Sequence, residues 1–301
     1  MTTPPVLAFE VGVDDGDRLD RVVARRFPAA SRRRVMALFE AGAVRVDGRR
    51  AKKGERVGPG ARVEVATAPV DDAALVVVGD PAAAAAVAWL AIDDEVVALG
   101  KPAGMASQPL AAGEPGTAAN AVVARFPECA AVADDPRDGG LVHRLDAGTS
   151  GILLAARTRA AWQRLRAAFA DGAVTKTYLA LTEAPPVTRE CDAPLVQRGA
   201  RAAVDHTDGL AAHTAWEVIE RLGPRALVRC TATTGRTHQV RVHLATCGAP
   251  IVGDVAYGGA PLPELATFFL HAESIAIAGR RFVAPLPDDR VAVLARLRDA
   301  G

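Results

Sequence analysis

From residue 89 onward, short apolar runs are separated by glycine, proline and charged residues, and this pattern predicts a sheet with helices beside it. Four runs have the length of strands, the first of them folded as a hairpin: 89–104, 151–156, 174–183 and 225–234. Residues 158–171 and 237–248 instead repeat apolar positions at helical spacing, and Thr237 and Gly248 are suited to begin and end the second helix. Strands and helices do not alternate regularly, so we predict an α+β fold with a mostly antiparallel mixed sheet and flanking helices.

A separate pattern occupies residues 15–65 and predicts a small domain. Apolar residues recur at helical spacing over 19–27 and 35–39, and valines alternate over 44–46 and 63–65. This order predicts two helices followed by a small sheet, with Gly42 after the second helix. Residues 66–88 are rich in alanine and proline and are interpreted as a linker. The chain is therefore expected to divide into a domain at 1–65, a linker at 66–88 and a larger domain at 89–301.

Positive charge is concentrated in the predicted small domain. The 301 residues carry a net charge of +1, whereas residues 1–65 hold 14 Arg and Lys against 9 Asp and Glu, a net charge of +5. Arg32, Arg33 and Arg34 fall in the first turn of the second helix, where the helix dipole is already positive and a phosphate group would be favoured. An anionic partner is one interpretation. Since only four of the 36 basic residues are lysines, an arginine-rich composition with a solvated surface is the other.

Composition argues against several classes of protein. Half of the residues are hydrophobic, but no run is long enough for a membrane span and no secretion signal is recognised. The four cysteines are scattered, without a CxxC pair, and the six histidines show no metal-ligand spacing. The sequence also contains no GxGxxG or Walker motif. We therefore expect a cytoplasmic protein with no membrane contact, no metal and no nucleotide cofactor.

One polar cluster stands at the mouth of an apolar run, HRLDAGTSG at 143–151. Its single carboxylate, Asp146, is suited to act as a nucleophile or base, provided that a cation keeps it ionised. The segment TTGRTHQVRVHLA at 233–245 offers that cation, since His238 and Arg241 share one face of the predicted helix. The spacing by itself is equally compatible with an ordinary surface arginine at position 241.

These segments resemble one family, the RluA-type pseudouridine synthases. HRLDAGTSG is similar to the signature of that family, and six further blocks match in its order: KPAGM at 101–105, TKTYLAL at 175–181, TGRTHQVRVHL at 234–244, PIVGDVAYG at 250–258, FLHA at 269–272 and FVAPLPDD at 282–289. Residues 15–65 resemble the small RNA-binding domain named after a ribosomal small-subunit protein, which commonly precedes this catalytic domain.

The resemblance implies that uridines in RNA are isomerised after the base is extruded from its stack, without a cofactor or metal. It assigns Asp146 as the essential catalytic residue, either attacking the anomeric carbon or removing the 2′ proton, and Arg241 as its partner. Tyr178, which the strand pattern alone leaves open as an ordinary core residue, would stack on the uracil. Arg144 would enter the space left by the base, with Leu145 pointing the opposite way into the core in a strand-like run.

The resemblance and the charge pattern together suggest a set of RNA contacts. In the larger domain these are His143, Arg144, Lys101, Lys176, Arg236 and His238, and in the small domain Arg32, Arg33, Arg34, Arg49, Arg50, Lys52 and Lys53. For the two lysines of the larger domain, a phosphate contact and a structural ion pair are both open. The pairing of domains favours large-subunit ribosomal RNA as the substrate, and a monomer is expected.

Two alternatives belong to other classes of function. A non-catalytic RNA-binding or ribosome-assembly protein on the same scaffold is disfavoured because Asp146, Tyr178 and Arg241 are all present. A hydrolase of nucleoside bonds is disfavoured because no second carboxylate accompanies Asp146 at acid–base spacing.

Overall fold

The structure, a computed structural model, describes residues 7–15, 18–28, 30, 32–52, 54–68, 76–111 and 113–300, with the backbone alone described at residues 14, 32 and 33. The chain divides into two units, Met1–Val76 and Val77–Gly301. Each unit has apolar clusters of its own, and each is described here by itself.

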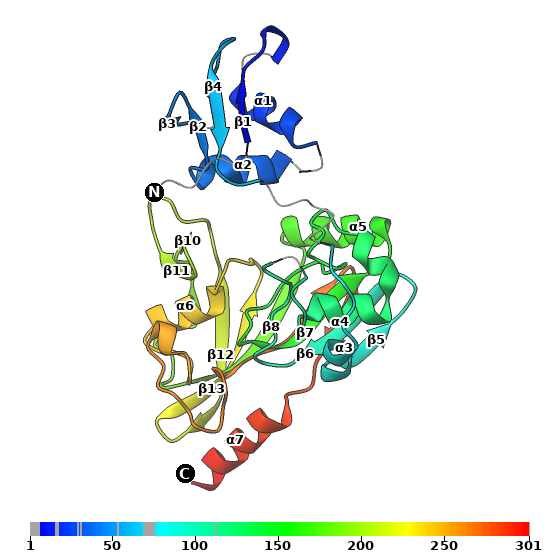
Figure 1. The fold of residues 1–301 in the computed structure, drawn as a ribbon. Coiled ribbons are helices and arrows are strands. Elements are labelled where there is room, and N and C mark those ends of the chain that lie inside the picture. Colours follow the sequence, from blue (N-terminus) through cyan, green and yellow to red (C-terminus); the bar gives the residue numbers. More distant parts are fainter. Residues whose placement is uncertain are drawn as a thin grey trace. The chain divides into compact units, whose positions relative to one another are not determined.

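The first unit packs two helices on a small antiparallel sheet, as the sequence pattern predicts (Figure 1). Its elements are β1 (Leu7–Glu10), η1 (Val13–Asp15), α1 (Leu19–Arg26), α2 (Arg32–Glu40), β2 (Val44–Val46), β3 (Arg49–Arg50) and β4 (Arg62–Val65). The strands pair in the order β1-β4-β2-β3. Leu19, Val23, Val44 and Val63 are fully buried between helices and sheet, and Gly42 ends α2 with a φ of 71°, the left-handed conformation that glycine adopts without strain.

The second unit is built on a nine-stranded mixed sheet. Its elements are α3 (Pro81–Ala86), β5 (Ala88–Ile92), β6 (Val96–Lys101), α4 (Ala118–Arg125), η3 (Pro127–Ala131), β7 (Ser150–Ala156), α5 (Arg159–Ala170), β8 (Thr175–Thr182), β9 (Glu190–Cys191), β10 (Leu195–Arg198), β11 (Arg201–Val204), β12 (Thr214–Leu222), β13 (Arg225–Ala232), α6 (Gln239–Thr246), η4 (Val255–Tyr257), β14 (Leu270–Ile277), β15 (Arg280–Val283) and α7 (Asp288–Asp299).

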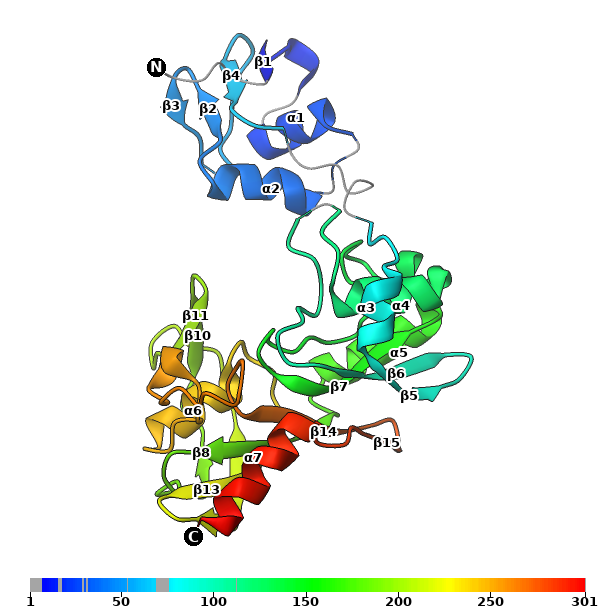
Figure 2. The ribbon, with the colours of Figure 1, turned by 60° about the horizontal axis from the view of Figure 1, so that its bottom comes forward.

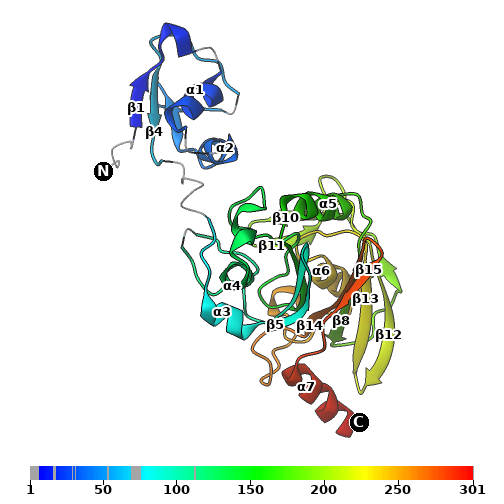
Figure 3. The same ribbon diagram turned by 90° about the vertical axis from the view of Figure 1, so that its right-hand side faces the viewer.

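The strands follow the order β5-β6-β7-β14-β8-β13-β12-β9, and β15 pairs with β14. β7 and β14 pair in parallel, whereas the other pairs among the described strands are antiparallel. Helices α3, α4 and α5 gather beside β5–β7, and α6 lies toward the other end of the sheet near the β10–β11 hairpin (Figures 2 and 3). The predicted α+β class and mostly antiparallel mixed sheet are confirmed.

Part of the segment interpreted as a linker belongs to the second unit. The backbone N–H of Val77 donates to Pro136 O at 3.1 Å. Residues Pro81–Ala86 form α3, with the Asp80 carboxylate accepting hydrogen bonds from the N–H groups of Ala82 and Ala83. Alanine is the best helix former and proline is favoured in the first turn, so this composition suits a capped helix. The interpretation as a linker was therefore wrong for residues 77–88.

The HRLD segment is not a strand, although its alternation holds. Leu141 forms an isolated bridge with Ala155, and residues 143–147 lie outside the strand ladders. Leu145 is nevertheless buried while Arg144 is exposed. Ser107 fixes this direction, because its Oγ accepts from the Leu145 N–H at 2.9 Å and donates to the Leu145 carbonyl at 2.8 Å.

Two further findings concern metal groups and membrane-spanning helices among the described residues. No group of three or more His, Cys, Asp or Glu side chains among them is arranged to hold a metal ion. None of the described helices is long and apolar enough to cross a membrane.

Candidate active site

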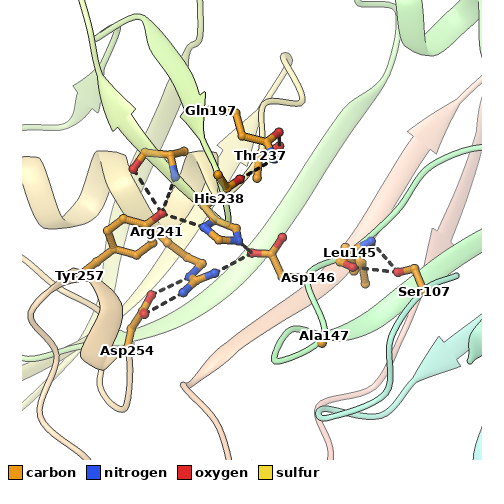
Figure 4. Close-up of polar contacts among 12 residues, drawn as sticks. Ser107, Leu145, Asp146, Ala147, Gln197, Thr237, His238, Arg241, Asp254 and Tyr257 are labelled. Atoms are coloured by element: carbon orange, nitrogen blue, oxygen red, sulfur yellow. Dashed lines mark hydrogen bonds and ion pairs between the residues drawn. The ribbon is translucent and has the colours of Figure 1, made fainter. Parts of the chain in front are cut away.

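Asp146 occupies a turn between the buried Leu145 and strand β7. The N–H of Thr149 donates to the Asp146 carbonyl at 3.0 Å and closes the turn. The side chain is 23% exposed. Figure 4 shows that it points away from Ser107 and toward the start of α6, where His238 and Arg241 converge on it. The turn therefore presents one half-buried carboxylate to a group of side chains from a distant part of the chain.

Arg241 binds two carboxylates from a buried position on α6. Its Nη1 donates to Asp146 Oδ2 at 3.0 Å, while Nε and Nη2 donate to the Asp254 carboxylate at 2.7 and 2.8 Å. Burial alone would lower the pKa of Arg241, but the hydrogen bonds and charges of Asp254 and Asp146 outweigh it, so the pKa is raised. The pair with Asp146 that the resemblance implies is present, and Arg241 is not an ordinary surface residue.

Two aromatic rings hold the Arg241 guanidinium from its sides. Its central carbon lies 4.9 Å from the ring centroid of Tyr257 and 4.3 Å from that of Phe268, distances at which a cation is attracted to a ring face. Phe268 also packs against the Asp146 turn, since a Cβ at Gly148 would lie 2.6 Å from its ring. The aromatic contacts thus fix the guanidinium and the turn relative to each other.

His238 precedes α6 in a left-handed backbone conformation, with φ of 55° and ψ of 20°. Its Nε2 lies 3.7 Å from Asp146 Oδ2, and its Nδ1 lies 2.7 Å from the Tyr257 hydroxyl. The prediction that Thr237 caps this helix was wrong. The helix begins at Gln239, and the Thr237 hydroxyl instead donates to Gln197 Oε1 at 3.0 Å.

Tyr178 lies at the middle of the sheet, in register with Cys230 of β13 and Ala272 of β14. It packs against two of the apolar clusters of the second unit. Burial, followed by the negative charge of Asp146, raises the pKa of the Tyr178 hydroxyl, so this group is protonated near neutral pH. The structure therefore brings Asp146, Arg241 and Tyr178 into one electrostatic environment.

Lys101 and Lys176 are oriented inward, and this placement gives neither of them the expected phosphate contact or ion pair. Lys101 Nζ donates to the carbonyls of Pro102, Met105 and Ala147 at 3.0, 2.7 and 3.1 Å. Burial lowers its pKa to about 7, against the raising effect of Asp146. Lys176 Nζ donates to the Thr234 carbonyl, and burial lowers its pKa to about 8. Both lysines therefore hold loops next to the site through hydrogen bonds to backbone carbonyls.

His143 also faces the interior. The N–H of Leu154 donates to its Nε2 at 3.0 Å, and its ring stacks on Phe169 with centroids 4.9 Å apart. Burial lowers the pKa of His143 to about 3. These contacts give it a packing role in place of the RNA contact expected from the sequence.

Most of the other expected RNA contacts lie at the surface where they are described. Arg144 and Arg236 are exposed, and Arg236 Nε donates to the Ala211 carbonyl at 2.9 Å. In the first unit Arg49 pairs with Glu55, Arg50 donates to the Glu40 carbonyl at 2.9 Å, and Lys52 is exposed.

The predicted arginine run does begin α2, since the helix starts at Arg32. The side chains of Arg32 and Arg33 and the whole of Lys53 lie outside the described residues, and Arg34 is partly buried.

Sequence reasoning missed four residues that shape the site. Asp254 and Tyr257 lie in PIVGDVAYG, a block that matched the resembled family but received no role. That block was the available signal for them. Phe268 and Ser107 had no such signal, because each acts only through a neighbour that is distant in the sequence.

Comparisons with known proteins identify the relatives of this chain. The family described as RNA pseudouridylate synthase matches residues 95–246, and the S4 domain matches residues 17–63. An uncharacterized RNA pseudouridine synthase of Chloroflexus aurantiacus is 36% identical, covering 94% of this chain and 90% of the relative. A ribosomal large subunit pseudouridine synthase D of Pseudomonas aeruginosa is 32% identical, covering 96% and 94%.

Among solved structures, human RNA Pseudouridylate Synthase Domain Containing 4 shares the fold with a TM-score of 0.58 at 22% identity. The match covers 70% of this chain and 93% of that one.

Proposed function

The chain belongs to the RNA pseudouridylate synthase family and carries an S4 domain, and from this premise we propose that Asp146 is the catalytic residue with which it isomerises uridines of large-subunit ribosomal RNA. The choice of RNA is supported by the names of relatives in Xanthomonas campestris and Pseudomonas aeruginosa, each a ribosomal large subunit pseudouridine synthase D. This chain matches both relatives over nearly their whole length. We further propose that the enzyme acts as a monomer, in the cytoplasm and without a cofactor.

The observation that carries this proposal is the convergence of Arg241 and His238 on the half-buried carboxylate of Asp146, with Asp254 holding Arg241 in place. A charge taken partly out of water needs a partner, and Arg241 provides it at 3.0 Å. Both chemical routes open to Asp146, attack on the anomeric carbon and removal of the 2′ proton, require the ionised carboxylate. The same cation serves either route.

The target base has to leave its stack before Asp146 reaches the sugar, at a cost of roughly a few kcal/mol. Arg144 is exposed two residues before Asp146 and enters the space that the base leaves. Tyr178, protonated and held on β8 in the middle of the sheet, receives the face of the extruded uracil. The exposed arginines of the first unit supply phosphate contacts that carry no sequence information.

Release of tritium from RNA labelled at carbon five of uracil tests the role of Asp146. We expect wild type to release tritium and Asp146→Asn to release none above background, with RNA binding retained and with no effect of a chelator. Asp94→Asn, at an exposed position in the turn between β5 and β6, is the matched control and keeps the wild-type rate. Release by Asp146→Asn at the wild-type rate would remove Asp146 from the reaction.

A further inference from the structure

The two oxygens of the Asp146 carboxylate have different surroundings. Arg241 Nη1 and His238 Nε2 both approach Oδ2, at 3.0 and 3.7 Å. Oδ1 has no hydrogen bond or ion pair with any residue that the structure describes. One oxygen is thus held by the protein, and the other is left to meet the substrate.

The second polar contact of His238 is with the Tyr257 hydroxyl. The other neighbours of this hydroxyl indicate in which direction it donates its proton. Tyr257 Oη accepts from the N–H of Ala202 at 2.9 Å. Its single proton has two possible acceptors, His238 Nδ1 at 2.7 Å and the Ala202 carbonyl at 3.3 Å. The shorter contact is the stronger hydrogen bond, so the hydroxyl donates to Nδ1.

A neutral imidazole that accepts at Nδ1 carries its proton on Nε2. Burial lowers the pKa of His238, although the charges of Asp146 and Asp254 oppose this, so the ring is neutral near pH 7. With the proton on Nε2, an N–H bond faces the carboxylate. The other tautomer would direct a lone pair at a negative charge, which is unfavourable. Both ends of the ring therefore select the same tautomer.

The backbone at His238 indicates that this placement costs free energy. A left-handed conformation outside glycine costs roughly 1 to 3 kcal/mol and persists where the surroundings enforce it. His238 has no side-chain capping bond to α6 that would explain the conformation. What the conformation achieves is the approach of the ring to Asp146 and Tyr257 (Figure 4).

We infer that His238 is a positioning residue which, with Arg241, holds Oδ2 of Asp146 through an Nε2–H bond fixed by Tyr257, and thereby leaves Oδ1 as the oxygen that reacts. Ala202 belongs to β11, so the same chain of hydrogen bonds ties the β10–β11 hairpin to the reacting carboxylate. The inference rests on the proposed role of Asp146. It differs from the RNA contact that the sequence suggested for His238.

Two amide substitutions distinguish a role of the His238 side chain as hydrogen-bond donor from a role of the His238 backbone conformation. In glutamine the amide nitrogen reaches the position of Nε2, whereas in asparagine it reaches only that of Nδ1. Asparagine, however, tolerates the left-handed conformation better. A purely conformational role therefore favours His238→Asn, and a donor role favours His238→Gln.

We expect His238→Asn to lower the single-turnover rate at saturating RNA by about tenfold to a hundredfold, the worth of a hydrogen bond to a charged group. His238→Gln should stay within about threefold of wild type, and the Kd for RNA should be unchanged in both. Activity retained by asparagine and lost by glutamine would overturn the inference. A weakened Kd with an unchanged rate would do the same, in favour of an RNA contact.

Nitrogen-15 NMR of the histidines in the full-length free protein provides a readout that does not depend on catalysis. The signals of His238 are identified by their absence in His238→Gln. We expect the proton on Nε2 in wild type. In Tyr257→Phe, which keeps the ring against Arg241 but loses the hydroxyl, only Asp146 still selects this tautomer, so we expect its share to fall. A proton on Nδ1 in wild type would refute the inference even if Asp146→Asn is inactive. Conversely, an active Asp146→Asn would refute the catalytic role while this measurement still reports the tautomer.

Discussion

Asp146 and Asp254 both bind the guanidinium of Arg241. These two carboxylates explain how a charged side chain is accommodated on the buried face of α6. Arg241 uses three of its donors, two on Asp254 and one on Asp146. A planar guanidinium suits this division, because its donors form a fixed fork that a lysine cannot reproduce. Asp254, to which we assign no part in the reaction, therefore helps to fix Arg241 and through it the Asp146 carboxylate.

His143 illustrates the opposite case, a titratable side chain next to the site that is purely structural. Its pKa is lowered to about 3 by burial, so between pH 3 and 6.5 the unfolded chain binds a proton that the folded chain does not. Stability rises with pH wherever the unfolded state binds more protons, so this residue destabilises the fold as the pH falls below 6.5.

His143→Gln offers a carbonyl oxygen to the Leu154 N–H but cannot be protonated. When the pH is lowered from 6.5 to 4.5, we expect the free energy of unfolding to fall by about 2 to 3 kcal/mol less in this variant than in wild type. Urea unfolding at the two pH values measures this difference. RNA binding by the variant at pH 7.5 should match wild type. Parallel losses in the two proteins, or weakened RNA binding, would contradict a packing role.

At the scale of elements, the parallel pairing of β7 with β14 depends on one glycine. Gly151 pairs with Ala272 and has a φ of 119°. A Cβ at this position would lie 2.2 Å from the Ala272 carbonyl oxygen, far inside a normal contact. Because β7 follows the Asp146 turn directly, this close approach also sets where that turn begins.

Gly151→Ala should therefore lower the free energy of unfolding by about 2 to 4 kcal/mol, through backbone strain and overpacking together. Gly172→Ala is the matched control, since Gly172 has a φ of 71° but nothing within 4 Å of its would-be Cβ. It should cost only about 1 to 2 kcal/mol, the strain alone. Equal losses in the two variants, measured by urea unfolding, would show that the contact with Ala272 is unimportant.

Helices and strands with a clear period were predictable one by one. The apolar spacing of residues 158–171 and the alternation of 174–183 both appear in the structure, as α5 and β8. Helix α3 was missed because its alanines carry no amphipathic period. The start of α6 was misplaced because the left-handed turn at His238 is enforced by contacts with Tyr257 and Asp146, not by a local capping residue.

At the scale of the whole molecule, the two units have separate cores. The apolar cluster of the first unit contains residues between Leu7 and Val65, and the clusters of the second begin at Val77. The first unit holds the excess positive charge of the chain, whereas the second holds Asp146, Tyr178 and Arg241. We therefore expect deletion of the first unit to affect RNA binding and to leave the chemistry in place.

Removal of residues 1–76 should weaken RNA binding and flatten the dependence of log Kd on log salt, because fewer phosphate contacts release fewer counterions. The rate of the bound complex at saturating RNA should remain close to that of the full chain. Binding titrations over a range of salt concentrations measure the slope, and circular dichroism confirms that the second unit is folded. An unchanged slope would mean that the arginines of the first unit make no phosphate contacts.

The sequence by itself determined the types of the elements, the existence of two domains and, through its resemblance to one family, the set Asp146, Tyr178 and Arg241. These follow from local spacing and from motifs that are contiguous in the chain. It also indicated which residues are basic, but not which of them face inward, because burial of a lysine or histidine depends on what packs over it.

Only the tertiary structure decided the partners of the site. Asp254, Tyr257, Phe268 and Ser107 act on Asp146 or its turn across long sequence separations. Such contacts arise when strands and loops from different parts of the chain meet at one sheet, and no local period encodes them. The tautomer and the orientation of His238 depend on such contacts too, since its two ring nitrogens contact residues that lie 92 positions before it and 19 positions after it.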